Sequence, residues 1–197
     1  MLFRSGCDMS LFPEWMLSWV RASENAGSSN EEFSAVWNNG QSGLSAWYNS
    51  SQTGTVSVSG TATLQSGGAS AIALDVGTNN FGTVVIGGST TTNVTLVDAD
   101  GIILGGMDID GNLDVDAGGD ITDAATITVA GTASFVSTGD SSDLVLNQLA
   151  VTGAIDVTTD DVTVDADFAD VTLVNATGIQ FANTSNVEGA LTATAST

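Results

Sequence analysis

The side chains best suited to chemistry in this chain are carboxylates separated by single residues. One set has the spacing found at the start of calcium-binding loops: Asp98, Asp100, Asp108, Asp110, Asn112 and Asp114. Calcium takes about six to eight oxygen ligands and needs a flexible turn, which Gly101 or Gly111 would supply. The glutamate that closes an EF-hand loop is missing, however, and acids alternating along a strand usually face solvent. We therefore expect a solvated acidic face, with weak or loosely bound calcium as the alternative.

Negative charge dominates the second part of the chain. Residues 1–55 contain both arginines and five acids, for a net charge of −3, whereas residues 56–197 contain 18 acids and no base. A dense stretch comprises Asp156, Asp160, Asp161, Asp165, Asp167 and Asp170. Such a surface repels nucleic acid and anionic lipid, so neither is expected as a direct partner. Cations in solution would reduce the mutual repulsion of the acids.

Catalysis has few candidate residues. The chain has no histidine, and no lysine or arginine follows Arg21. A polysaccharide lyase needs a base with a pKa near neutrality and a cation or metal to stabilise developing charge. Glycoside hydrolysis uses two carboxylates, for which Asp98 with Asp100 and Asp160 with Asp161 are the candidates. Adjacent residues of a strand point to opposite faces, which weakens the second pair. We expect no enzymatic activity.

The N-terminal residues give no targeting signal. No apolar run approaches the roughly 20 residues of a membrane-spanning helix. Residues 1–20 are interrupted by Arg4, Asp8 and Pro13 and lack the continuous apolar core of a signal peptide. The single cysteine, Cys7, cannot form an internal disulfide framework or a zinc site. We expect the chain to be a fragment whose export signal lies elsewhere.

Aromatic residues separate residues 1–50 from residues 51–197. The first segment holds all four tryptophans: Trp15, Trp19, Trp37 and Trp47. Helical spacing between Phe12 and Val20 predicts one short helix, and a second is expected from Asn30, with Glu31 and Glu32 in its first turn. We expect 1–50 to be a partly helical cap or docking segment. The tryptophans are its candidate residues for docking a partner or stacking on carbohydrate.

Residues 51–197 form a repeat region of short strand-like runs. Residues 93–102 and 170–179 are identical at seven of ten positions, and residues 58–64 and 129–135 at four of seven. The pattern of residues 81–86 also recurs at 152–157. The offsets of 77 and 71 residues indicate two copies of a unit of about 71–78 residues. Strand groups within each unit recur about every 20 residues, which is typical of one solenoid coil.

Strict alternation along residues 107–118 indicates a strand with one apolar and one polar face. Ile109, Leu113 and Val115 share one side, and the intervening acids share the other. Similar short strands at regular spacing stack in parallel and bury their inward residues against the next turn. We therefore expect an all-β fold, a parallel β-helix of roughly six or seven coils stacked about 4.8 Å apart. A β-sandwich is the alternative.

Two segments carry a resemblance to a known class of proteins. Residues 93–106 (NVTLVDADGIILGG) and 111–135 (GNLDVDAGGDITDAATITVAGTASF) resemble the repeats of filamentous-haemagglutinin-type adhesins. These are large secreted bacterial surface proteins of the two-partner secretion and autotransporter classes. The resemblance covers about residues 56–197 and transfers no binding residue. It implies a right-handed parallel β-helix, export, and a role as a shaft or adhesive surface.

We therefore expect a structural or adhesive segment of an extracellular, cell-surface protein that forms an acidic β-helical rod. Its partners would be a host or neighbouring-cell surface, or further copies of itself. The main alternative is a filament subunit that stacks end to end through its exposed strand edges. Binding of ice or another surface by threonine ladders would need Thr-x-Thr on one face of every coil. Only Thr61–Thr63 and Thr126–Thr128 show that spacing clearly.

Overall fold

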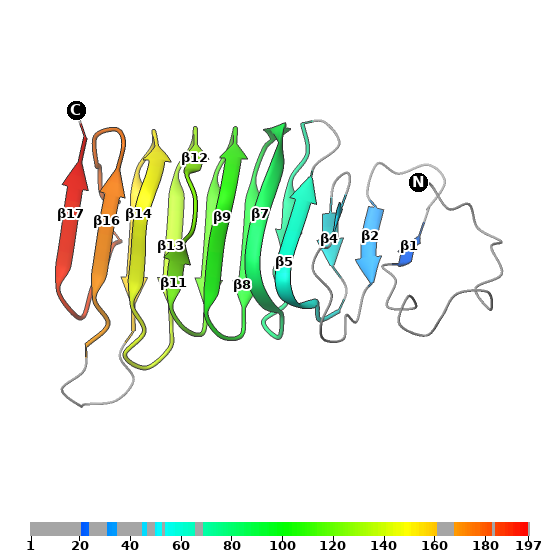
Figure 1. Ribbon diagram of the computed structural model, residues 1–197, viewed down its shortest axis with the longest axis horizontal. Coiled ribbons are helices and arrows are strands. Elements are labelled where there is room, and N and C mark those ends of the chain that lie inside the picture. Colours follow the sequence, from blue (N-terminus) through cyan, green and yellow to red (C-terminus); the bar gives the residue numbers. More distant parts are fainter. Residues whose placement is uncertain are drawn as a thin grey trace.

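The chain winds through two facing β-sheets to form a parallel β-solenoid (Figure 1). The computed structural model describes residues 21–23, 31–34, 45–46, 50–52, 54–65, 69–160, 168–182 and 184–196. All seventeen regular elements in these residues are strands. Sheet A contains β1 (Arg21–Ser23), β2 (Glu31–Ser34), β4 (Ser50–Gln52), β6 (Ile72–Leu74), β8 (Val94–Asp98), β10 (Leu113–Ala117), β13 (Ala133–Ser137) and β15 (Ile155–Thr159).

Sheet B faces sheet A across the core. It contains β3 (Ser45–Ala46), β5 (Ser57–Gln65), β7 (Asn80–Thr91), β9 (Ile102–Ile109), β11 (Ile121–Asp123), β12 (Ile127–Val129), β14 (Leu144–Val151), β16 (Val171–Asn175) and β17 (Leu191–Ala195). Short strands β11 and β12 both pair with β9 and β14, so they share one turn of the solenoid.

Parallel pairing in register joins each turn to the next. In sheet A, Val94 pairs with Leu113, Leu113 with Ala133, and Ala133 with Ile155, which are steps of 19, 20 and 22 residues. One turn is therefore about the length that the sequence repeat predicts. Among the described strands, β1 and β2 form the single antiparallel pair. Parallel stacking confirms the solenoid and rules out the antiparallel β-sandwich.

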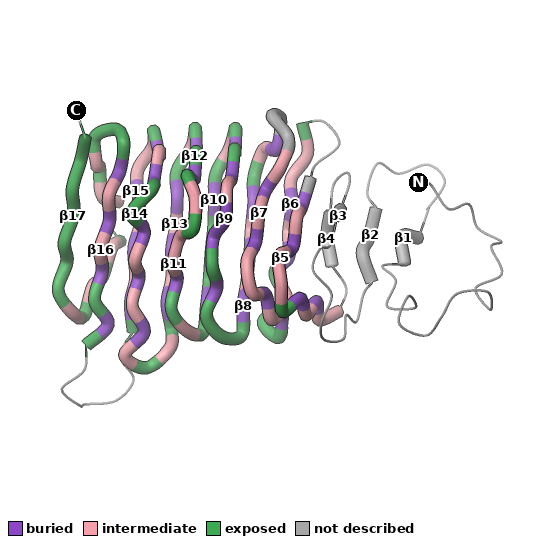
Figure 2. Tube along the Cα trace, in the orientation of Figure 1, coloured by how far each residue is buried: buried purple, intermediate pink, exposed green. Residues whose placement is uncertain are grey.

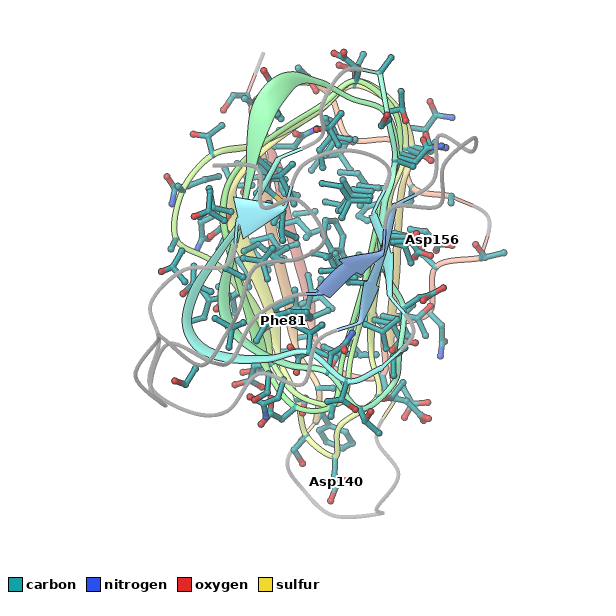
Figure 3. The ribbon with its side chains drawn as sticks, turned by 90° about the vertical axis from the view of Figure 1, so that its right-hand side faces the viewer. Phe81, Asp140 and Asp156 are labelled. Carbon is teal, nitrogen blue, oxygen red and sulfur yellow. The ribbon has the colours of Figure 1, made fainter. Side chains whose placement is uncertain are left out.

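The core lies between the two sheets and is continuous from Val56 to Leu173. Inward residues are buried and outward residues are partly or fully exposed, so burial alternates along the strands in both sheets (Figure 2). A view along the long axis shows apolar side chains filling the interior, with Asp156 on the outside of sheet A (Figure 3). Phe81 and Phe135 are among the largest fully buried side chains. Complete burial of one such side chain stabilises the fold by roughly 1.5–3 kcal/mol.

The structure corrects the helix expected from Asn30. Residues Glu31–Ser34 form strand β2, which pairs in parallel with β4 through Glu31 and Ser50. Stacking on a neighbouring turn provides backbone hydrogen-bond partners, whereas a short isolated helix is marginal in water. Strand β3 likewise continues sheet B by pairing with β5. The helix expected between Phe12 and Val20 lies outside the described residues.

The two copies of the sequence repeat place matching segments in opposite sheets of the solenoid. Residues 93–102 include β8 of sheet A, whereas their copy at 170–179 includes β16 of sheet B. Residues 81–86 lie in β7 of sheet B, and their copy at 152–157 leads into β15 of sheet A. The offsets therefore span about three and a half turns. A strand with this alternating pattern can lie in either sheet, because both sheets need the same alternation of inward and outward residues.

The structure corrects the single strand expected over residues 107–118, because a corner divides it. Strand β9 ends at Ile109 and β10 begins at Leu113, while buried and exposed residues continue to alternate. Gly111, Gly131 and Gly153 stack at this corner, where the N–H groups of Gly131 and Gly153 donate to the preceding glycine carbonyl at 2.9 Å. A Cβ atom on Gly131 would lie 2.5 Å from the Gly111 oxygen, so this backbone approach requires glycine.

Candidate functional site

Aspartates at one corner link successive turns of the solenoid. The backbone N–H of Asp143 donates to Asp120 Oδ1 at 2.9 Å, and the N–H of Asp170 donates to Asp143 Oδ1 at 2.9 Å. The N–H of Ala190 in turn donates to Asp170 Oδ1 at 2.7 Å. Each carboxylate therefore accepts a charge-assisted hydrogen bond from the next turn. These three residues, the aspartate ladder, have a structural role that their spacing in the sequence does not reveal.

Asparagines form an equivalent ladder at another corner. Asn93 Oδ1 accepts from the N–H of Asn112 at 2.9 Å, and Asn112 Oδ1 accepts from the N–H of Thr132 at 2.9 Å. Asn112 was a candidate calcium ligand, and its side-chain oxygen instead satisfies a backbone donor. Because corners lack the regular ladder of a sheet, side-chain oxygens here replace backbone acceptors.

Asn175 satisfies backbone groups inside the solenoid, where it is fully buried. Its Oδ1 accepts from the N–H of Val151 at 2.8 Å, while its Nδ2 donates to the oxygens of Val151, Thr177 and Gly178 at 3.0 Å each. An amide can donate and accept at the same site, as these partners require. Asn79 is buried in the same way and accepts from the N–H of Val56 at 2.9 Å.

Asp98 is the acid whose protonation the fold changes most among those described. It lies at the end of β8 with 3% of its surface exposed. Its Oδ2 accepts from the N–H of Phe81 at 2.7 Å, and its Oδ1 accepts from the N–H of Asp100 at 3.1 Å. Burial raises the pKa of the Asp98 carboxyl to about 7, against the lowering effect of these hydrogen bonds, and the nearby Asp100 carboxylate adds to the rise.

Titration of Asp98 predicts a pH-dependent stability. Its pKa rises from 3.8 to about 7 on folding, so the folded state binds this proton more tightly. The resulting stabilisation is complete below the unfolded pKa and is lost as pH rises through about 7. We expect a loss on the order of 2–3 kcal/mol between pH 5 and 8, because about two units of the pKa rise fall in this range and one pKa unit is worth about 1.4 kcal/mol.

The comparison variant is Asp98→Asn, which cannot titrate. Urea unfolding of both proteins from pH 5 to 8 separates this group from the general repulsion of the other acids. The unfolding free energy of the parent protein should fall more steeply with pH than that of the variant. Equal slopes would show that Asp98 does not titrate in this range.

The outer face of sheet A carries aspartates at regular outward positions. Asp114 lies beside Thr95 of β8 and Ser134 of β13, and Asp156 of β15 follows Ser134. Partial burial raises the pKa of the Asp116 carboxyl, and the Asp114 carboxylate raises it further. Asp156 accepts hydrogen bonds from the hydroxyl groups of Thr184 and Ser185. Asp114 and Asp116 are exposed to solvent, as the alternation predicts for these two residues.

The six candidate calcium ligands do not gather at one place. Asp98 and Asp100 precede β9, whereas Asp108 lies near its other end and Asp110 follows it. Eight strand residues separate the two groups by roughly 25 Å. Asn112 and Asp114 lie at and beyond the far corner, on the side of sheet A. In the described part of the chain, no three Cys, Asp or Glu side chains are grouped to hold a metal ion. Calcium binding remains a prediction.

Asp98 and Asp100, the candidate pair for glycoside hydrolysis, make hydrogen bonds within the fold. Asp98 accepts the two backbone hydrogen bonds described above, and Asp100 Oδ2 accepts a hydrogen bond from Asn80 Nδ2 at 2.7 Å. Asp161, of the second pair, lies outside the described residues, as do Asp165 and Asp167. The side chains of Trp15, Trp19, Trp37 and Trp47 also lie outside them, so partner docking by these residues stays a prediction.

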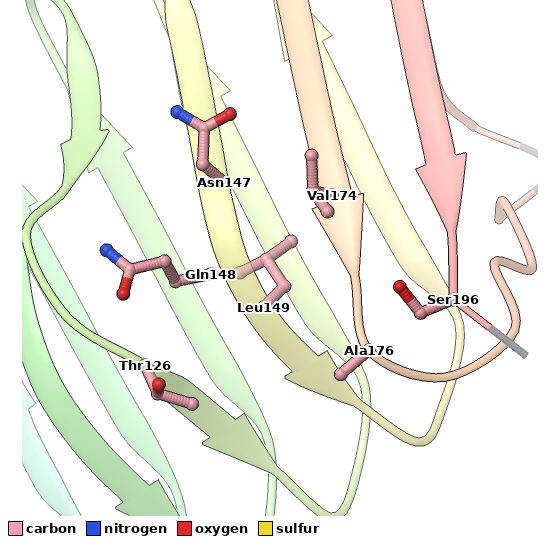
Figure 4. A pocket seen from close by; sticks show the side chains of 7 residues that line it. All are labelled: Thr126, Asn147, Gln148, Leu149, Val174, Ala176 and Ser196. Carbon is pink, nitrogen blue, oxygen red and sulfur yellow. The ribbon is translucent and has the colours of Figure 1, made fainter.

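One shallow depression of about 280 Å³ lies on sheet B (Figure 4). It forms where β14 contains an extra residue relative to β16, between Leu146 and Leu149. Its walls combine amide, hydroxyl and aliphatic groups, from Thr126, Asn147, Gln148, Leu149, Val174, Ala176 and Ser196. The lining contains no carboxylate, thiol or cation beside the hydroxyl groups of Thr126 and Ser196.

An uncharged row of outward residues runs along sheet B. Register pairs place seven β-branched side chains on successive turns: Thr61, Thr83, Ile103, Thr122, Val145, Thr172 and Thr192. We call this row the sheet B stripe. Sequence reasoning missed it because its members are about 20 residues apart and only the pairing register aligns them. Along sheet B, Thr-x-Thr occurs at Thr61–Thr63, Thr126–Thr128 and Thr192–Thr194 but not on every described turn, so these residues do not make the regular ladder required for ice binding.

Comparisons with known proteins agree with the repeat architecture. Within the described residues, no helix is long and apolar enough to cross a membrane. No curated protein and no solved structure matches the chain significantly. A family model described as repeats of unknown function (DUF5649) matches residues 41–87 and 91–158, which together make up more than half of the chain. The chain therefore belongs to the family of DUF5649 repeats.

Proposed function

We propose that this chain is a structural and adhesive segment of a secreted bacterial surface protein, in which it forms an acidic β-solenoid shaft. The observation that supports this most is the unbroken parallel stacking of turns from β4 to β16 around one aliphatic core. Each turn buries its apolar residues only by contact with its neighbours. Additional turns therefore lengthen the solenoid without changing the packing of the others.

Side chains at the corners support a mechanical role. The aspartate ladder and the Asn93–Asn112–Thr132 ladder add hydrogen bonds between turns beyond those of the two sheets. The net charge of −21 favours solubility and repulsion from other polyanions. The proposal includes extracellular location, contact with a host or neighbouring-cell surface, and no enzymatic activity or required cofactor. The resemblance of residues 93–135 to adhesin repeats supports the location.

Surface labelling of intact cells tests the location. An antibody raised against residues 56–197 should label intact bacteria that produce the full-length protein, and external protease should remove the signal. A cytosolic protein in the same cells serves as the control for lysis. Labelling that requires permeabilised cells, despite abundant protein in the lysate, would contradict an extracellular role.

A filament subunit that stacks end to end is the second candidate, and β17 favours it. All five residues of β17 are exposed, and Leu191 has 47% of its surface exposed. Exposed strand edges are templates for pairing with another chain. Negative-stain electron microscopy of the purified chain, with and without millimolar calcium, separates the two candidates. Filaments one solenoid wide would support the subunit, and short particles at every concentration would support the shaft segment.

A further inference from the structure

We propose that residues 180–182 and 184–186, the strap, close the edge of sheet A against pairing with another chain, and that Asp156 is the side chain that holds the strap in place. Sheet A ends at β15, whereas sheet B continues with β16 and β17. A shaft needs only turns that stack, so a contact that closes one sheet edge goes beyond the proposed function.

The strap satisfies backbone groups along the edge of β15. The N–H of Ile155 donates to the Gln180 oxygen at 2.8 Å. The N–H of Thr159 donates to the Asn186 oxygen at 3.0 Å, and the N–H of Asn186 donates to the Val157 oxygen at 2.8 Å. Exposed strand edges are templates for pairing, and native proteins cover them with loops. Contacts of this kind therefore make the strap such a cover.

The strap is longer than the part of the strand that it covers. Isolated parallel bridges join Ile155 to Phe181 and Thr158 to Asn186, so three residue steps along β15 face five along the chain. Partly buried Phe181 and Val187 pack against the core. A segment with few buried apolar contacts opens at a lower free energy than the strands of the core. The strap is therefore a segment that can open while the solenoid stays folded.

Asp156 and Ser185 hold the strap on the outside of sheet A (Figure 3). The N–H of Val157 donates to Ser185 Oγ at 3.2 Å, so a side-chain oxygen takes the place of a backbone carbonyl. The Ser185 hydroxyl in turn donates to Asp156 Oδ1 at 2.9 Å, and the Thr184 hydroxyl donates to Asp156 Oδ2. Both bonds to the carboxylate are charge-assisted and hence stronger than bonds between neutral groups. Loss of the carboxylate would release both hydroxyl groups from the strand.

A second copy of the chain is the partner that an opened edge would accept. Each copy carries the same edge, so a two-fold axis can align two β15 strands antiparallel about Val157. Asp156 is the single acid in residues 154–159, so little charge opposes this pairing. The strap is thus an autoinhibitory contact, because it occupies the backbone groups that the second copy would use.

Residue-resolved amide hydrogen exchange of the full chain at constant pH tests the clamp. Asp156→Ala should raise the exchange rate of the Val157 N–H at least tenfold, and Ser185→Ala should do the same without a change of charge. Asp156→Asn keeps a side-chain oxygen that can accept from Ser185, so its rate should lie between those of the parent and Asp156→Ala. Circular dichroism verifies that each variant is folded.

Asp114→Ala is the matched control. It removes one acid from the same outward row of sheet A, in which Asp114 and Asp156 both lie beside Ser134. Strand β10 is paired on both sides, so no strap depends on this carboxylate. The control should leave the exchange rate of the Val157 N–H unchanged.

Sedimentation velocity tests the effect of the strap on association. In about 0.5 M NaCl, where charge repulsion is screened, Asp156→Ala and Ser185→Ala should each contain more dimer than the parent chain at equal concentration. Asp114→Ala should match the parent. Any association through β17 is common to all four proteins and cancels in this comparison.

Each outcome decides a part of the proposal. Unchanged exchange of the Val157 N–H in both strap variants would overturn the clamp. Faster exchange without added dimer would overturn the role of the strap against pairing. An equal rise in dimer for Asp114→Ala would show that total charge, not the strap, controls association. These results concern one edge of sheet A, so the proposed shaft function is tested separately.

Discussion

Replacement of Phe135 by alanine should lower the free energy of unfolding by about 3–5 kcal/mol. Phe135 is fully buried at the centre of β13, and its register neighbours are Val115 in the preceding turn and Val157 in the following turn. Truncation removes apolar contacts on both sides and leaves a cavity that the parallel strands cannot collapse to fill. Urea unfolding followed by circular dichroism measures the change.

Phe168 provides the matched control for this substitution. It has 55% of its surface exposed and is not part of the hydrophobic core cluster. Phe168→Ala should change the unfolding free energy by no more than about 0.5 kcal/mol. Similar losses for the two variants would contradict the assignment of Phe135 to a central core and Phe168 to the surface.

Alanine in place of Gly131 should cost about 2–3 kcal/mol, although it adds only one methyl group. The new Cβ would lie 2.2 Å from Asn112 Oδ1 and 2.5 Å from the Gly111 oxygen. Both atoms belong to the preceding turn, and Gly153 of the following turn bonds to the Gly131 carbonyl at 2.9 Å. The corner can relieve this overlap only by separating the turns. Equilibrium unfolding in urea is again the measurement.

Gly178→Ala is the control because a Cβ there would meet nothing within 4 Å. This variant should unfold at nearly the same urea concentration as the parent chain. If Gly131→Ala is equally harmless, the close stacking of Gly111, Gly131 and Gly153 is absent in solution. The stacking of turns at this corner would then have to be looser than the structure shows.

Alternation in the sequence predicted the inward residues, and the regular spacing of the strand-like runs favoured the parallel solenoid over the β-sandwich. Ile109, Leu113 and Val115 are buried and the acids between them are exposed, as a period of two requires. Alternation is a local property of each strand, so one sequence can report it. Alternation does not indicate which of the two sheets a strand belongs to, because β8 and β16 share a pattern yet lie in opposite sheets.

Contacts between turns could not be predicted in the same way. The burial of Asp98 depends on its capping the N–H of Phe81, 17 residues earlier in the chain. The aspartate ladder and the sheet B stripe also join residues about one turn apart. Turns vary in length: Val94 and Leu113 are 19 residues apart, for example, whereas Leu144 and Val171 are 27 apart. Only the register fixes which residues are neighbours. The strand at Glu31–Ser34 was missed for a related reason, because its partner at Ser50 comes from the next turn.

The register of the turns is tested most directly by disulfide trapping in a Cys7→Ser background. Asp114 and Ser134 are paired on the outer face of sheet A, and their Cα atoms should be about 4.8 Å apart. That separation lies within the range of roughly 4.4–6.8 Å that a disulfide spans. Asp114→Cys with Ser134→Cys should therefore form an intramolecular disulfide under mild oxidation. Thr95→Cys with Ser134→Cys spans two turns, about 9.6 Å, and should not. Trapping of the second pair but not the first, or of neither, would contradict the parallel solenoid on which the proposed function rests.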